Sequence, residues 1–227
     1  MPDTTTHTPT VVSRSDWLIA RKELLEREKR LTRERDALNA ARRELPMVRI
    51  DKDYVFEGPG GPVKLIDLFQ GRHQLIVYHF MFDPAWEKAC AGCTGFVDDL
   101  PGLEGLHKHD TSLAVIGRAP QAKLAAYGEL QGWAIPLYSS FGSDFNYDFH
   151  VTSDEKMRPA EYNYRPRAEH VENGEPWFAD GEHHGISVFL REGDRVFHTY
   201  STYARGVEPV VPVLHYLDMT PLGRQGA

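Results

Sequence analysis

The chain has 227 residues, of which 41% are hydrophobic and 26% are charged, and its formal net charge at pH 7 is −7. This length and composition are typical of a globular chain that can bury a core without disulfide staples. The acidic balance argues against a general nucleic-acid-binding role, and no stretch approaches the roughly 18 consecutive apolar residues of a membrane span, so neither nucleic acid nor membrane is predicted as a partner.

Residues 1–12 are polar and rich in threonine, and we expect a disordered tail there. The chain does not start with a basic segment followed by an apolar one, so a secretory signal is not expected. The predicted location is therefore the reducing cytoplasm, where a pair of cysteines is more often catalytic or redox-sensing than a structural staple.

Residues 13–45 are dense in Arg, Lys, Glu, Leu and Ala and lack Gly and Pro, which predicts one long helix. Ser13 is suited to cap its start and Pro46 to stop it. A stripe of apolar residues recurs at an interval of seven: Trp17, Leu24, Leu31, Leu38 and Leu45. The positions four residues further on are charged, which disfavours a sustained two-stranded coiled coil. The stripe instead suggests a helix packed across the domain or against a second copy in a homodimer. An exposed charged helix with one packing edge is the alternative.

From residue 46 to 224 the pattern becomes that of one α/β domain. Near-continuous apolar runs at 75–78 and 113–116 are typical of buried parallel strands. A helix is expected from near Cys90 and another over 119–131. A hairpin is expected from the runs 186–190 and 196–200, and a last helix within 207–217. Residues 139–180 show little periodicity, which indicates an insertion. The order predicts an α/β fold, a thioredoxin-like three-layer sandwich with an N-terminal helical extension and an insertion before the C-terminal hairpin.

The only two cysteines form a Cys-x-x-Cys motif, Cys90 and Cys93, just beyond the apolar run 73–82. Two intervening residues let both sulfurs meet in the first turn of a helix, where the dipole and free N–H groups lower the pKa of a thiol. A strand, a loop and a Cys-x-x-Cys helix in this order are typical of thioredoxin-like redox chemistry. We expect Cys90 to be the attacking thiolate and Cys93 the resolving thiol.

Other interpretations of the cysteine pair stay open at this point. With His183 or His184 they could form a metal- or ligand-binding module that is not an enzyme, although adjacent histidines do not have the usual spacing of zinc ligands. They could be two ordinary core cysteines. On the same scaffold, oxidation of Cys90 to a sulfenic acid followed by attack from Cys93 would reduce peroxides. The sequence predicts no metal and no cofactor.

Three further residues are candidates for the walls of the site. Trp86 could form a lip over Cys90, or be an aromatic packed on the domain. His184 could tune the stability of the thiolate, or belong to a structural histidine pair. Arg205 could bind an anion such as a carboxylate, or form a structural salt bridge. For His79, within the strand before the motif, we expect a hydrogen-bonded core histidine.

Several strings resemble an uncharacterised bacterial thioredoxin-like family, domain-of-unknown-function family 899. They lie at residues 45–48, 78–82, 90–93, 132–133, 139–140, 144–146, 198–206 and 217–224, and the N-terminal helix shares the likeness. The resemblance implies a thioredoxin-like fold and a dithiol–disulfide oxidoreductase. Its substrate would be a disulfide-containing protein or small molecule, and neither substrate nor reductant is named.

The chain departs from ordinary thioredoxins at two positions. Ala89, rather than Trp, precedes Cys90, and His183, His184 and Gly185 stand before the strand that a cis-proline should precede. The Pro-x3-Thr-x2-Cys pattern of peroxidatic cysteines is also absent. These departures make ordinary thioredoxin activity a question for the structure.

Overall fold

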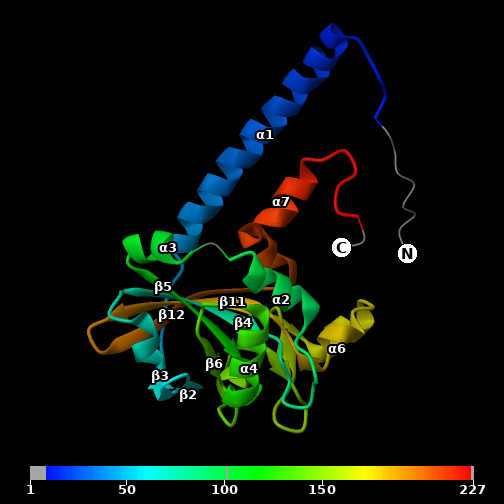
Figure 1. Ribbon diagram of the computed structural model, residues 1–227. Helices are drawn as coiled ribbons and strands as arrows, with labels where there is room; N and C mark the ends of the chain where they lie inside the picture. The colour runs from blue at the N-terminus through cyan, green and yellow to red at the C-terminus, as the bar shows by residue number, and fades with distance from the viewer. Residues whose placement is uncertain (1–8, 101, 226–227) are drawn as a thin grey trace. The chain divides into compact units, whose positions relative to one another are not determined.

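The computed structural model describes residues 9–100 and 102–225 (Figure 1). It divides into two compact units, one made of Met1–Pro46 with Pro212–Ala227 and the other of Met47–Val211. The predicted domain of residues 46–224 extends past Val211, where the second unit ends. Most of the expected disordered tail at 1–12 lies outside the described residues, which begin at Pro9.

The first unit contains the expected long helix, α1 (Arg14–Arg43). The Ser13 side chain caps it by accepting a hydrogen bond from the Asp16 backbone N–H at 3.1 Å, which satisfies one of the free donors of the first turn. No residue of α1 is buried, and the apolar stripe of Trp17, Leu24, Leu31 and Leu38 is exposed along it. The homodimer therefore stays a prediction. A second helix of this unit, α7, spans Pro212–Asp218.

The described part of the second unit is built on an eight-stranded sheet of order β1-β12-β11-β4-β5-β6-β2-β3. The strands are β1 (Val48–Arg49), β2 (Val55–Gly58), β3 (Gly61–Lys64), β4 (Gln74–Phe80), β5 (Thr111–Gly117), β6 (Leu137–Ser139), β11 (Gly185–Glu192) and β12 (Arg195–Tyr203). Strands β4, β5 and β6 are parallel, whereas β11 runs antiparallel to both β4 and β12. The two buried apolar runs expected from the sequence are the centre of this sheet.

The side chains of β4 alternate between the two faces of the sheet, and on both faces they are mostly apolar. Helical segments therefore cover both faces. Leu75 and Val77 pack in one cluster with η1 (Leu65–Phe69) and α5 (Phe145–Asp148). Tyr78 and Phe80 pack in another with α2 (Ala91–Asp98) and α4 (Gln121–Gln131). A short helix, α3 (Glu104–Lys108), precedes β5. Three layers result, as the sequence predicted.

The chain order confirms the thioredoxin-like fold class (Figure 1). Strand β4 leads into α2, which carries the Cys-x-x-Cys motif, and then come the parallel strand β5, helix α4 and strand β6. The antiparallel hairpin β11–β12 then adds to the free edge of β4. The predicted fold class depended on this order, with the cysteines at the carboxyl end of a central strand.

The segment between β6 and β11, predicted as an insertion, contains short elements rather than one long loop. They are α5, β7 (Thr152–Ser153), β8 (Glu161–Tyr162), β9 (Arg165–Pro166), α6 (Arg167–Glu172), η2 (Pro176–Phe178) and β10 (Gly181–Glu182). A small core of Val151, Tyr162 and Tyr203 joins this segment to the end of β12. Elements of two to six residues are too short to produce a periodic pattern, which is why the sequence showed none.

The helix expected within residues 207–217 is interrupted. The 3₁₀ segment η3 (Ala204–Val210) contains Pro209, and α7 begins only at Pro212. Proline lacks the N–H that a continuous α-helix needs, so this segment is divided into a 3₁₀ part that contains Pro209 and a short α-helix that begins at Pro212. In the described residues, no helix is long and apolar enough to cross a bilayer.

Candidate active site

The two cysteines lie at the start of α2, after the loop that follows β4. The Cys90 backbone N–H donates to the Met81 carbonyl at 3.1 Å, which fixes the loop between strand and helix. Cys90 is the N-cap residue of α2, and Cys93 lies within its first turn. Both are free thiols; Cys90 is half-buried, whereas Cys93 is only 2% exposed. An incoming molecule can therefore meet Cys90 before Cys93.

The helix start holds Cys90 as a thiolate. A hydrogen bond from the Cys93 side chain, helped by the backbone N–H groups of Cys93 and Gly92, lowers the pKa of Cys90 to about 5, although burial opposes the shift. These N–H groups are free because the first turn of a helix leaves its donors without partners in the helix. Cys90 is therefore ionised at neutral pH, and the thiolate is the nucleophilic form of cysteine.

Cys93 is held as a thiol. Its hydrogen bond to Cys90 and its burial raise the pKa of Cys93 well above its usual value. Two groups act in the opposite sense, the Tyr78 hydroxyl and the Met81 backbone N–H, which both hydrogen bond to the Cys93 sulfur. The site thus contains one exposed thiolate and one buried thiol that share a hydrogen bond.

His184 stands directly before β11, close enough to Cys90 for the two groups to interact electrostatically. The charge of either group affects the pKa of the other. The His184 Nε2–H donates to the Ala204 carbonyl at 3.3 Å, and burial lowers the pKa of His184, so its imidazole is neutral at neutral pH. Of the predicted wall residues, His184 is the one that the structure brings to the cysteine pair.

The string at residues 198–206 helps to hold His184 in place. Ala204 has a left-handed backbone (φ 47°), its N–H donates to the Tyr162 hydroxyl at 2.8 Å, and that hydroxyl donates to the His184 carbonyl at 2.9 Å. Gly185 lets the two segments approach, because a Cβ there would lie 2.5 Å from the Tyr203 ring. A strained alanine is maintained only where surrounding contacts over-determine it.

Trp86 and Arg205 lie at the surface. Trp86 is 36% exposed. Its backbone N–H donates to the Asp83 carbonyl, and its backbone carbonyl accepts from the Lys123 side chain. The Arg205 side chain is 86% exposed and pairs with Glu208, with 2.8 Å between Nε and Oε1. The structure therefore brings together Cys90, Cys93 and His184, and the roles of Trp86 and Arg205 stay predictions.

The metal-binding interpretation finds no support in the described residues. His183 Nε2 hydrogen bonds to Ser153 Oγ at 2.9 Å and His184 Nε2 to the Ala204 carbonyl, so one nitrogen of each imidazole already has a protein partner. Across residues 9–100 and 102–225, no group of three or more His, Cys, Asp or Glu side chains is arranged to hold a metal ion.

Two site residues were missed from the sequence, Tyr78 and Tyr162. Tyr78 carried a signal, because it places a polar hydroxyl within a mostly apolar buried strand, where such a group needs a partner. Tyr162 carried none: it lies in a two-residue strand within the aperiodic segment, and its partners His184 and Ala204 are distant in sequence.

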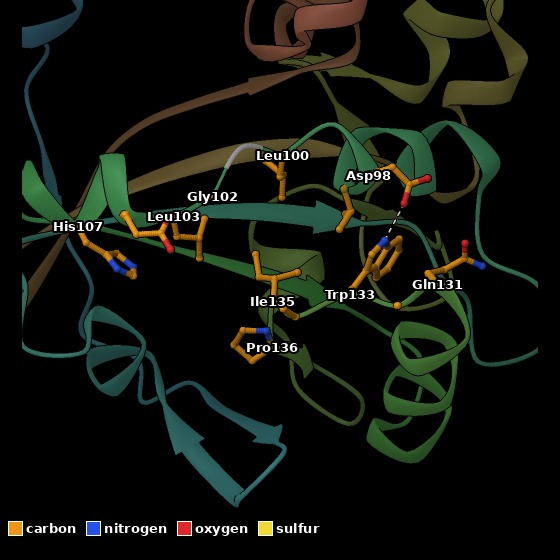
Figure 2. Close-up of a pocket in the computed structure, with 13 residues that line it drawn as sticks. Asp98, Leu100, Gly102, Leu103, His107, Gln131, Trp133, Ile135 and Pro136 are labelled. Carbon is orange, nitrogen blue, oxygen red and sulfur yellow. Dashed lines mark hydrogen bonds between the residues drawn. The ribbon is translucent and has the colours of Figure 1, made fainter.

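A separate pocket of about 590 Å³ lies at the other end of α2 (Figure 2). Leu100, Ile135 and Pro136 form part of its wall, and Trp133 Nε1 donates to Asp98 Oδ1 at 2.7 Å across its edge. Asp98 is the last residue of α2, about 12 Å along the helix from Cys90 at a rise of 1.5 Å per residue. The pocket is therefore not part of the thiol site.

The family described as "Bacterial protein of unknown function (DUF899)" matches residues 6–227. The chain belongs to this family. The likeness of the strings at 78–82, 90–93 and 198–206 thus extends over almost the whole chain, and those strings supply β4, the thiol motif and the support of His184. No curated protein matches the DUF899 chain.

Solved structures resemble this DUF899 chain only distantly. A cysteine-to-serine variant of peroxiredoxin Q from Xanthomonas campestris is 15% identical, with 77% of this chain and 97% of that chain covered and a TM-score of 0.47. Peroxidoxin BcpB from Mycobacterium tuberculosis is 14% identical over 76% and 97% of the two chains, with a TM-score of 0.45. A putative protein disulfide isomerase from Bacteroides thetaiotaomicron is 16% identical over 75% and 91%, with a TM-score of 0.40.

Proposed function

We propose that this protein is a thiol–disulfide oxidoreductase in which Cys90 attacks a substrate disulfide and Cys93 resolves the resulting intermediate. The observation that supports it most is the asymmetry of the pair. A half-buried thiolate at a helix start shares a hydrogen bond with a buried thiol one turn away. A purely structural pair of core cysteines would not need an ionised, accessible member.

The chemistry proceeds in two exchanges. The Cys90 thiolate attacks one sulfur of the substrate; a new S–S bond forms, the substrate S–S bond breaks, and its electron pair leaves with the first substrate thiolate. Cys93 loses its proton and attacks the Cys90 sulfur, which releases the second substrate thiolate and leaves a Cys90–Cys93 disulfide. The substrate gains two electrons and the protein loses two. An external thiol or dithiol reductant returns the pair to its starting state.

The substrate we propose is a disulfide in a protein or a small molecule. Cys90 is only half-buried, so the target sulfur can be reached from solvent, while the buried Cys93 needs to contact only Cys90. His184, neutral beside Cys90, forms one wall against which the disulfide would lie. His184 stands directly before β11, where the sequence of an ordinary thioredoxin would have a cis-proline.

Trapping the intermediate tests this function. The Cys93→Ser variant should accumulate a mixed disulfide with a model substrate such as oxidised glutathione, because the resolving thiol is missing. Cys90→Ser should form no adduct, and the unchanged protein should release two thiols and gain an internal disulfide. Intact-protein mass spectrometry distinguishes all three states.

The same variants separate the function from peroxide reduction. A peroxidase would turn hydrogen peroxide over and leave Cys93→Ser with a sulfenic acid at Cys90. Failure of Cys93→Ser to form the mixed disulfide, together with fast formation of that sulfenic acid, would replace the oxidoreductase by a peroxide reductase.

A further inference from the structure

The Tyr78 side chain points from the central strand β4 toward α2, the helix that carries the reactive pair. Tyr78 lies in β4, between Val115 of β5 and Ile186 of β11, and is only 2% exposed. Its ring stacks on Phe96 of α2, with 3.8 Å between ring centroids and 13° between planes. Tyr78 and Cys93 lie in the same buried cluster, and the pKa of each reflects a hydrogen bond between the Tyr78 hydroxyl and the Cys93 sulfur. The phenol is thus clamped between the central strand and the helix that carries both cysteines.

The resolving step creates an electrostatic problem at Cys93. In the resting pair, the negative charge lies on Cys90, which receives the N–H groups of the helix start. Once Cys90 is joined to substrate, the charge must form on Cys93 instead, within a cluster that includes Phe96, Val97 and Ile186. A buried thiolate with no donor would be strongly disfavoured in such apolar surroundings.

The groups that face Cys93 limit what can stabilise this charge. Cys90 is neutral once it is in the mixed disulfide, so it no longer opposes a charge on Cys93. The Met81 N–H is a backbone donor to the Cys93 sulfur. Tyr162 interacts with Cys93 only through charge. His184 lies beside Cys90 and is neutral. The Tyr78 hydroxyl is the side-chain donor that already contacts the sulfur.

We propose that Tyr78 is a catalytic residue of the resolving step, whose hydroxyl donates a hydrogen bond to the Cys93 thiolate while that thiolate attacks Cys90. This inference rests on the proposed function and specifies its second half. The first substrate thiolate to leave takes the proton of Cys93. The Cys93 electron pair then forms the Cys90–Cys93 bond, and the bond between Cys90 and substrate breaks with its electron pair on the second substrate thiolate.

Tyr78 keeps its own proton throughout. Burial raises the pKa of Tyr78 well above its usual value, so the phenol acts as a donor and not as an acid. A hydrogen bond to a charged acceptor is about twice as strong as one between neutral groups. The contact therefore stabilises the attacking form of Cys93 more than its resting thiol.

Rapid mixing with an aromatic disulfide whose released thiolate is coloured resolves the two steps. In the unchanged protein, two equivalents should appear in two phases, the first from attack by Cys90 and the second from attack by Cys93. Tyr78→Phe keeps the ring on Phe96 and removes only the hydroxyl. We expect an unchanged first phase, a second phase slowed about 10- to 100-fold, and a pH midpoint of that phase moved to higher pH.

Tyr127→Phe is the matched control. The Tyr127 hydroxyl also bonds to α2, but at Thr94 Oγ1, 2.8 Å away, rather than at a cysteine. Its second phase should keep both the rate and the pH midpoint of the unchanged protein. A Tyr78→Phe second phase with unchanged rate and midpoint would overturn the proposal.

A second variant covers the case in which Tyr78→Phe does not fold. Replacing Tyr78 by 3-fluorotyrosine gives a more acidic, stronger donor of almost the same size, so the second phase should become faster and its midpoint should move to lower pH. An unaltered second phase would overturn the proposal. Failure of the proposed function looks different, because the unchanged protein would then release only one equivalent of coloured thiolate, keep the aromatic group on Cys90 and form no Cys90–Cys93 disulfide.

Discussion

Neighbouring residues of β4 lead to two different buried polar sites. Tyr78 points to the α2 face and hydrogen bonds to Cys93, whose partner Cys90 is partly exposed at the surface. His79 points to the other face, where its ring packs against Phe145 and Phe149, with 2.8 Å between its Nε2 and Ser187 Oγ. From Ser187 the chain of bonds continues to Ser201 and on to His198, at 2.8 and 2.7 Å. One network ends at an accessible reactive atom, whereas the other ends at His198, whose ring packs against Phe149 and Phe189.

The comparison teaches that burial of a polar group does not by itself indicate function. The pKa of His79 is lowered to about 3 by burial, a displacement nearly as large as that of Cys90. Its contacts nevertheless lie on the side of the sheet away from the thiols. We therefore assign the His79 network to stability and the Tyr78 contact to chemistry.

The largest expected effect is the difference in reactivity between the two cysteines. With a pKa of about 5, Cys90 is mostly thiolate at pH 6, whereas an ordinary thiol is roughly 0.3% ionised there. The thiolate fraction of Cys90 at pH 6 is thus roughly 300-fold larger, but a thiolate of low pKa is a weaker nucleophile, so alkylation by iodoacetamide should be roughly 10-fold faster than for a free cysteine and should fall as the pH is lowered through 5. Mass spectrometry should find one label on the folded chain, at Cys90. Equal labelling of both cysteines would remove the proposed asymmetry.

The His79 network should appear in the pH dependence of stability instead. The folded pKa of His79, about 3, lies below its unfolded value near 6.5, so the unfolded chain binds more protons between these values. Stability should therefore decrease as the pH falls from 6.5 towards 3, with a contribution of up to about 1.4 kcal/mol per pH unit from this residue. Urea unfolding across that range measures the slope.

His79→Gln, which cannot titrate, should reduce that slope by about one proton and leave the rate of Cys90 alkylation unchanged. His183 also has a lowered pKa, about 4, and so the slope should not vanish. An unchanged slope in His79→Gln would show that His79 is not held neutral by burial.

A smaller effect is expected at Ser187, which joins the two histidines of the network through Ser201. Ser187→Ala leaves His79 without that partner, and the protein should lose about 1–3 kcal/mol of unfolding free energy at neutral pH. The alkylation rate of Cys90 should not change. Loss of thiol reactivity in this variant would mean that the two faces of β4 are coupled and that the assignment is wrong.

The sequence predicted the parts of the site that local patterns encode. An apolar run followed by Cys90 and Cys93 indicated the strand, the loop and the helix start, and the missing proline directed attention to His184. The core role of His79 followed from its place in an apolar strand, and its bond to Ser187 confirms it. These inferences needed only the order of residues within one or two elements.

Other features depend on contacts between distant segments and on where side chains point. The support of His184 by Tyr162 and Ala204 crosses 22 and 42 residues of sequence and passes through strands of two residues, which leave no periodic signal. The stack of Tyr78 on Phe96 depends on how α2 lies on β4. The exposed orientation of Arg205 could not be read from its place in a family-specific string.

Titration of the thiols in a series of glutathione or dithiothreitol redox buffers tests the central claim most directly. The account predicts one reversible two-electron transition between the free thiols and a Cys90–Cys93 disulfide, with a midpoint between about −300 and −120 mV. Two thiols that stay reduced across the whole range would contradict it, because a pair that cannot form its own disulfide cannot exchange one with a substrate.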